Sequence, residues 1–201
     1  GVRLVGSEMC IRDRDSDVRA SSLVTDLMHP ADYSHQSVEA TRAVVEDAAY
    51  MAGGHVTQVG SVVEEQIRDV RVRHYRPTGA VSPDEDLPTL VYFHGGGWVV
   101  GSLDSHDSTC RWLCEAARVA VLSVDYRLAP EHPFPAAPDD CCDVVDAAMA
   151  GEVKGVNKNK VAVGGDSAGG NLAAVVCLRR KREEREQPRA QLLFVPVTDL
   201  S

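Results

Sequence analysis

The chain has 201 residues, of which 44% are hydrophobic and 25% charged, a composition typical of a globular domain. Its 30 acidic and 21 basic residues give a net charge of −9, which disfavours nonspecific binding to nucleic acid or to an anionic membrane. No apolar run reaches the roughly 18 residues that an integral membrane segment needs, and no signal peptide is visible, so the default location is the cytoplasm.

The sequence contains six cysteines, which we interpret as reduced thiols. A disulfide framework is expected mainly in small secreted chains that cannot build a core. Cys110 and Cys114 are four residues apart and would share one face of a helix, but a zinc site would need two more clustered ligands. We therefore predict no metal site.

Both ends of the sequence are unusual. Residues 1–14 (GVRLVGSEMCIRDR) resemble translated adapter sequence, with an ordinary frayed terminus as the alternative. No helical or strand period runs through them, so we expect a non-native or disordered leader and leave it out of the fold prediction. At the other end the sequence stops just after the apolar run 192–197. We expect a truncated chain, because the residues that should cover such a strand are missing.

Apolar periodicity and turn-forming residues divide the rest of the chain into elements. In chain order we expect a helix at 34–51, strands at 59–67 and 70–75, a polar loop at 77–88, a strand at 90–93, a helix at 105–117, a strand at 119–124, a proline-stiffened loop, a helix at 138–149, a strand at 161–163, a helix at 168–186 and a strand at 192–195. Apolar strands that alternate with helices predict an α/β fold, with a mostly parallel sheet covered by helices on both faces.

The last expected helix carries a run of charges at residues 179–186. Opposite charges stand four positions apart in the pairs Arg179/Glu183 and Arg180/Glu184, a spacing that favours ion pairs along one helix. We interpret this run as a solvated helix end rather than as a docking patch.

The segment Gly165-Asp166-Ser167-Ala168-Gly169 matches the pattern G-x-S-x-G. An expected strand precedes it and an expected helix follows it, which is the context of a nucleophile elbow. So tight a turn strains the serine, and glycines on both sides let neighbouring backbones approach closely. A phosphate-binding loop would need a Gly-Lys-Ser/Thr ending, which the segment lacks. We predict that Ser167 is a nucleophile exposed at the positive end of a helix.

A second glycine-rich segment, His94-Gly95-Gly96-Gly97-Trp98, ends the strand expected at 90–93. Glycines leave backbone N–H groups unshielded, so that they can donate to the oxyanion of a tetrahedral intermediate, and Ala168 would contribute another donor. His94 could be mistaken for a catalytic base. We predict instead that it shapes the loop.

With these segments the sequence resembles the hormone-sensitive-lipase-like carboxylesterases of the α/β-hydrolase superfamily. The resemblance spans about residues 71–201 and adds the segments VDYRLAPEHPFPA (124–136) and VPVTD (195–199), all in the family's order. It implies that Ser167 is the nucleophile of a carboxylic ester hydrolase and that Gly96, Gly97 and Ala168 form the oxyanion hole. The resemblance also implies that His94, Trp98 and Asp166 have structural roles near the site.

The resemblance also implies a domain organisation and a substrate. Residues 15–55 would be a helical lid region over an acyl pocket, and residues 56–201 the first part of the catalytic domain. The substrate would be a small ester with a short- to medium-chain acyl group, and no metal or cofactor would be needed. Oligomeric state is left open.

The triad acid and histidine are missing from this pattern. In this fold the triad follows the chain order Ser, then Asp or Glu, then His. All seven histidines precede Ser167. The acids after it are Glu183, Glu184 and Glu186, on the charged helix end, and Asp199, at a strand exit that does not match the family's triad acid. Because losing triad members costs on the order of 10⁴ to 10⁶ in rate, we expect the chain as given to be nearly inactive.

Two other interpretations stay open. Plant hormone receptors of the same fold keep the pocket without the triad histidine, which makes a non-catalytic binding module the second hypothesis. The third is a gene-model fragment without a function of its own, which would explain both ends of the sequence.

Overall fold

The computed structural model describes residues 37–52, 55–80, 82 and 85–198. Residues Val38–Ser201 belong to one compact unit. The expected leader, the start of the helix expected at 34–51, the glycines expected to end that helix, and Asp199 lie outside the described residues.

A six-stranded sheet with the order β1-β2-β4-β3-β5-β6 forms the centre of the fold. Its strands are β1 (Ser61–Ile67), β2 (Val70–Arg76), β3 (Leu87–Phe93), β4 (Ala120–Val124), β5 (Val156–Asp166) and β6 (Gln191–Phe194). β2 pairs antiparallel with β1 and β4, whereas β4, β3, β5 and β6 are mutually parallel. The predicted mostly parallel sheet is confirmed.

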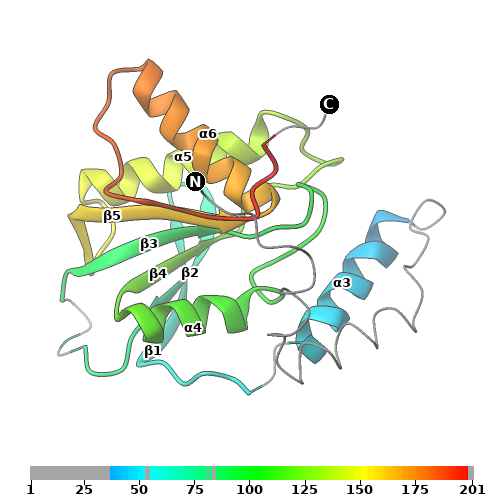
Figure 1. Ribbon diagram of the computed structural model, residues 1–201, viewed down its shortest axis with the longest axis horizontal. Helices are drawn as coiled ribbons and strands as arrows, with labels where there is room; N and C mark the ends of the chain where they lie inside the picture. Colours follow the sequence, from blue (N-terminus) through cyan, green and yellow to red (C-terminus); the bar gives the residue numbers. More distant parts are fainter. Residues whose placement is uncertain (1–36, 53–54, 81, 83–84, 199–201) are drawn as a thin grey trace, which may run out of the picture. The chain divides into compact units, whose positions relative to one another are not determined.

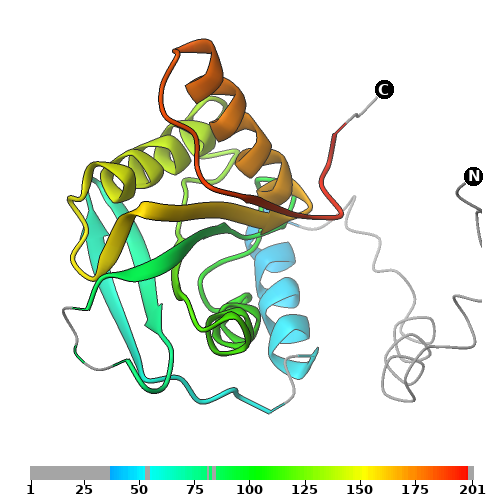
Figure 2. The same ribbon diagram turned by 60° about the vertical axis from the view of Figure 1, so that its left-hand side comes forward.

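Helices cover both faces of this sheet, as the sequence pattern predicted. The helices are α3 (Val38–Ala52), α4 (Asp107–Ala117), α5 (Ala136–Ala150) and α6 (Ala168–Arg182). Figures 1 and 2 both show α4 on one face and α5 with α6 on the other. Within the part of the chain that the structure describes, no helix has the length and apolarity needed to cross a membrane.

Two apolar cores follow from this layering. The larger core lies between the sheet and the α5–α6 layer and contains Val91, Phe93, Val163 and Leu172. The smaller core lies under α4 and contains Tyr92, Cys110 and Cys114. Alternate residues of β3 point into opposite cores, so the apolar run of this strand is buried on both faces.

The boundaries of several elements differ from the sequence prediction, and the strand expected at 161–163 runs from Val156 to Asp166. β3 begins at Leu87 and includes Pro88, which the sequence placed in a loop, and the pairing with β5 is irregular between Leu87 and Thr89. A proline has no N–H for the ladder, so such an irregularity is where a strand can accept one. Helix α6 ends at Arg182 rather than at 186, and Glu184 has the left-handed φ of 54° that breaks the helical path.

The interpretation of the charged run as a solvated helix end is wrong for Arg180, whereas residues 181–186 are exposed. Arg180 is buried and pairs with Asp146 of α5, and Arg179 pairs with Asp139 of α5 at 2.6 Å. The spacing of charges along α6 predicted intrahelical partners. The actual partners are on the neighbouring helix, which the spacing does not encode.

Candidate active site

The two glycine-rich segments leave neighbouring parallel strands at the same edge of the sheet. β3 pairs with β5, and Phe93 is the register partner of Gly165. His94 directly follows Phe93, and the turn that contains Ser167 directly follows Gly165. The loop and the turn therefore start side by side. The fold brings together the two segments that the sequence analysis selected independently.

Ser167 occupies the tight turn between β5 and α6. Its φ of 52° and ψ of −115° confirm the strained conformation that the sequence predicted. Backbone hydrogen bonds hold the turn in place. The N–H of Ser167 donates to the Phe194 carbonyl at 2.9 Å, and the Ser167 carbonyl accepts from the N–H groups of Asn171 and Val197, each at 3.1 Å. Within the described residues, the Ser167 hydroxyl makes no hydrogen bond to a protein group, which leaves it available to a reactant.

Glycines allow the turn to pack directly on the end of β3. A Cβ at Gly165 would lie 2.3 Å from the Phe93 carbonyl oxygen, and one at Gly169 would lie 1.9 Å from the same atom. Carbon and oxygen atoms cannot approach so closely without displacing backbone. The G-x-S-x-G spacing therefore meets a steric requirement of this junction.

The loop after β3 presents backbone N–H groups without partners. Gly96 and Gly97 have φ values of 120° and 59°, and Trp98 follows at 62°. The Gly96 carbonyl accepts from the N–H groups of Val99 and Val100 at 3.1 and 2.9 Å, which turns the loop back on itself. Across the described ranges, the N–H groups of Gly96, Gly97 and Ala168 donate to no protein acceptor. These are the three donors that the sequence assigned to an oxyanion hole.

His94 lies beneath this loop and is fully buried. Its ring stacks on Tyr126 with centroids 4.3 Å apart, and its Nδ1 lies 2.8 Å from the Gly95 carbonyl oxygen. The Tyr126 hydroxyl donates to the His94 carbonyl at 2.7 Å. Burial lowers the pKa of His94 to about 4, so its imidazole is neutral at pH 7.

Asp166, directly before Ser167, holds the most connected carboxylate of the site. Its Oδ1 accepts from the Tyr92 hydroxyl at 2.8 Å and from the Gly95 N–H at 3.1 Å, and the Nε2 of His106 lies 3.4 Å from its Oδ2. Burial opposes ionisation, but the hydrogen bonds from His106, Tyr92 and Gly95 outweigh it, so the pKa of Asp166 lies below its ordinary value. Burial and this carboxylate raise the pKa of Tyr92, which keeps its hydroxyl protonated.

Sequence reasoning missed Tyr92 and His106. Tyr92 reads as one more apolar residue of a buried strand, and His106 reads as the polar start of a helix. Each meets Asp166 across at least 60 positions of sequence, so no local spacing reveals the contact.

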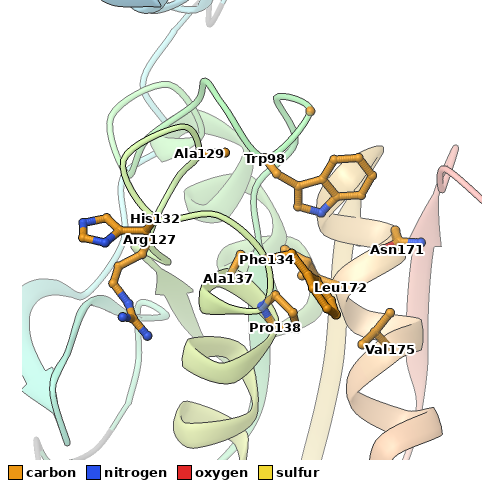
Figure 3. A pocket seen from close by; sticks show the side chains of 11 residues that line it. Trp98, Arg127, Ala129, His132, Phe134, Ala137, Pro138, Asn171, Leu172 and Val175 are labelled. Atoms are coloured by element: carbon orange, nitrogen blue, oxygen red, sulfur yellow. The ribbon is translucent and has the colours of Figure 1, made fainter.

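An apolar pocket of about 350 Å³ opens beside the glycine loop at residues 94–98. Its lining residues are Gly97, Trp98, Arg127, Ala129, His132, Phe134, Ala137, Pro138, Asn171, Leu172 and Val175. Figure 3 shows Trp98 near the α6 side chains Asn171 and Leu172, whereas His132 and Arg127 point away from them. The pocket thus joins the loop of the candidate donors to the first turns of the helix that follows Ser167.

Known proteins share these features. The α/β-hydrolase fold family matches residues 90–201, more than half of the chain. The carboxylic ester hydrolase LipN of Mycobacterium tuberculosis is 47% identical over 139 residues, which cover 66% of this chain and 36% of LipN. The ethyl acetate hydrolase of Pseudomonas putida is 39% identical over 173 residues, which cover 81% of this chain and 53% of that enzyme.

Solved structures agree with these relatives. An α/β-hydrolase enzyme from the metagenome of Lake Arreo, Spain, superimposes with a TM-score of 0.83 at 35% identity and covers 93% of this chain and 61% of its own. A hyperthermophilic esterase from the archaeon Pyrobaculum calidifontis gives a TM-score of 0.76 at 38% identity, over 83% of this chain and 55% of its own. The chain therefore spans about a third to a half of the length of these two curated relatives and somewhat more of the solved ones.

The matched fold and the placement of the serine turn define the class: this chain belongs to the α/β-hydrolase fold family. Within that superfamily it groups with the hormone-sensitive-lipase-like esterases, as the motifs around Ser167 and Gly95–Gly97 had indicated.

Proposed function

We propose that the protein hydrolyses small carboxylic esters through a serine nucleophile. Ser167 carries this proposal, because it combines a strained turn, a free hydroxyl and a position at the start of α6. Its Oγ attacks the ester carbonyl carbon and transfers its proton to a general base. The tetrahedral oxyanion then collapses, the alcohol leaves with the proton, and water hydrolyses the acyl-enzyme in the same way.

The backbone N–H groups of Gly96, Gly97 and Ala168 stabilise the oxyanion in this proposal. Donors without a protein partner need no rearrangement when charge develops on the substrate oxygen. His94 is assigned to the support of the loop rather than to proton transfer, because it is buried and its pKa is lowered to about 4. Trp98 forms one wall of the apolar pocket that receives the hydrocarbon part of the ester.

The pocket and the relatives support a short- to medium-chain acyl ester as substrate. The lining is mostly apolar, and one relative is named for the hydrolysis of ethyl acetate. The general base and the acid that orients it are proposed to lie outside these 201 residues, because the triad histidine follows the serine in this fold and no histidine follows Ser167 here. The 201-residue chain by itself is expected to be nearly inactive for this reason.

The region 15–55 is proposed to act as a lid, and Arg42 of α3 supports this role. Its guanidinium donates to the Val99 carbonyl at 2.8 Å and to the Ala129 carbonyl at 3.1 Å. It also pairs with Glu131 at 2.8 Å. Helix α3 is thereby tied to the oxyanion loop and to the proline-rich loop that borders the pocket.

The test is hydrolysis of p-nitrophenyl acetate and butyrate by the full-length gene product. Ser167→Ala is expected to lower the rate by about 10⁴- to 10⁶-fold, whereas Ser61→Ala, a matched change at an exposed position, leaves it unchanged. Unchanged turnover in the Ser167 variant would disprove the nucleophile assignment. A wild-type protein that binds esters without hydrolysing them would support the binding-module hypothesis instead.

A further inference from the structure

The carboxylate of Asp166 connects the two halves of the candidate site. Asp166 directly precedes Ser167, and its Oδ1 accepts the N–H of Gly95, the residue directly before Gly96. One side chain thus joins the turn that holds the nucleophile to the loop that holds two of the candidate oxyanion donors. Any movement of this carboxylate would change the distance between Ser167 and those donors.

The loop fits closely against that carboxylate. A Cβ at Gly95 would lie 2.1 Å from Asp166 Oδ2, so any residue other than glycine would clash with this carboxylate. The loop position is therefore set by contact with Asp166 as well as by the hydrogen bond.

Two side chains from the α4 side hold the carboxylate in place. The Tyr92 hydroxyl donates to Oδ1, and His106 Nε2 lies 3.3 Å from the same oxygen. Because an ionised carboxylate only accepts, Nε2 bonds it in the tautomer that carries a proton there, and the Gly95 N–H, 3.4 Å from Nε2, then donates to Oδ1 alone. The other ring nitrogen, Nδ1, lies 2.8 Å from Ser105 Oγ, which also accepts the Ser102 N–H at 2.8 Å. The turn before α4 thus fixes the imidazole plane.

We propose that Asp166 and His106 are positioning residues of the esterase site: His106 and Tyr92 hold the Asp166 carboxylate, and the carboxylate sets the place of the Gly95–Gly97 donors relative to Ser167. This inference rests on the proposed function. Neither residue touches the reacting atoms. Their effect is on how well the donors match the oxyanion, which exists only in the transition state.

The kinetic test uses the full-length protein with p-nitrophenyl butyrate. Asp166→Ala and His106→Ala are expected to lower kcat by roughly 10- to 100-fold, below the loss from removing a donor outright, with KM within about twofold. Asp166→Asn should restore most of the lost kcat, because its amide oxygen still accepts the Gly95 N–H. His55→Ala, at an exposed position, is the matched histidine control.

A trifluoromethyl ketone supplies a readout that a merely structural role would not change. It forms a tetrahedral oxyanion on the serine, so its inhibition constant should rise in parallel with the fall in kcat across the variants. Hydrogen exchange of the Gly95 amide, which donates to Asp166, should become faster in the same variants while the α5 and α6 amides keep their protection. If Asp166→Ala fails to fold, His106→Gln and Tyr92→Phe carry both measurements.

Each other outcome overturns a specific statement. Unchanged kcat and inhibition in the Asp166 and His106 variants would overturn the positioning role while the esterase assignment stands. A His106 loss as large as that of Ser167→Ala would make His106 a proton carrier instead. Absence of hydrolysis by the wild-type protein would refute the proposed function itself, and faster loop exchange in the variants would not rescue the inference.

Discussion

The two ends of α6 are held to the rest of the fold by different forces. At its N-terminal end, Gly169 and Gly165 let the backbone of the serine turn touch the backbone of β3. At its C-terminal end, Arg179 and Arg180 reach across to carboxylates of α5. The first end depends on glycines that lack a Cβ, and the second depends on ion pairs, of which the one between Arg180 and Asp146 is buried.

This difference decides which changes each end tolerates. An added methyl group is destructive at the N-terminal end because the neighbouring backbone has no room to move. At the C-terminal end, a change of volume matters less than the loss of the Arg180 charge, because Asp146 would stay mostly buried with only Arg185 as its partner. Ser167 lies at the first kind of end, which gives its turn a rigid frame.

The largest expected effect is that of Gly169→Ala. The new Cβ would lie 1.9 Å from the Phe93 carbonyl oxygen. We therefore expect a loss of about 3 kcal/mol or more in the free energy of unfolding. The matched control is Gly79→Ala, where φ is 84° and no atom lies within 4 Å of the Cβ. That variant should lose only about 1 kcal/mol, from backbone conformation alone. Urea unfolding midpoints of both variants decide the point, and equal losses would mean that contact does not govern the N-terminal end.

Arg180→Met tests the C-terminal end. The Arg180 side chain is 6% exposed, and besides pairing with Asp146 it donates to the Glu186 carbonyl at 2.7 Å. Removing it should cost about 3 kcal/mol, the lower end for a broken buried pair, because Arg185 still contacts Asp146 at 2.7 Å. Arg182→Met, exposed on the same helix, should change the free energy of unfolding by less than about 0.5 kcal/mol. A small loss at Arg180 would restore the interpretation of a solvated helix end.

The same contrast explains what the sequence could predict. The serine turn and the glycine loop could be predicted because each is a short run of sequence whose glycines have a local structural role. The alternation of apolar runs was enough to predict the layered fold. The partners of Arg180, Tyr92 and His106 are 34 to 74 positions away, so nothing in their neighbourhood in the sequence identifies them. Tertiary partners of polar side chains therefore mark the limit of prediction from local pattern.

The pH dependence of the free energy of unfolding tests the packing near the N-terminal end of α6. Burial lowers the pKa of His94 from 6.5 to about 4, with the nearby His106 acting in the same direction. Between these values the unfolded chain binds a proton that the folded protein does not, so this histidine makes stability fall as pH falls. From pH 7 to pH 5 its contribution should be about 2 kcal/mol.

The His94→Asn variant isolates that contribution. Its amide retains a donor near the Gly95 carbonyl but has no titrating group, so wild type and variant should converge in free energy of unfolding as the pH falls. His55→Asn, at an exposed site, should leave the pH dependence of the wild type unchanged. A constant gap between wild type and His94→Asn from pH 7 to pH 5 would show that the histidine is not held neutral by burial.

The smallest expected effect belongs to Arg42, which combines both modes of attachment. It donates to the Val99 carbonyl, which follows the glycine loop, and pairs with Glu131 in a contact where the two side chains are 26% and 47% exposed. Solvent screens such a pair, so a double-mutant cycle of Arg42→Met and Glu131→Gln should give a small coupling free energy that declines in 1 M salt. The salt-resistant part of the Arg42→Met effect then measures the backbone hydrogen bonds, which Glu131→Gln leaves in place. If the whole effect disappears in salt, α3 is held by charge alone, as at the far end of α6. If none does, α3 is held to the loop by its backbone contacts, in the manner of the serine turn.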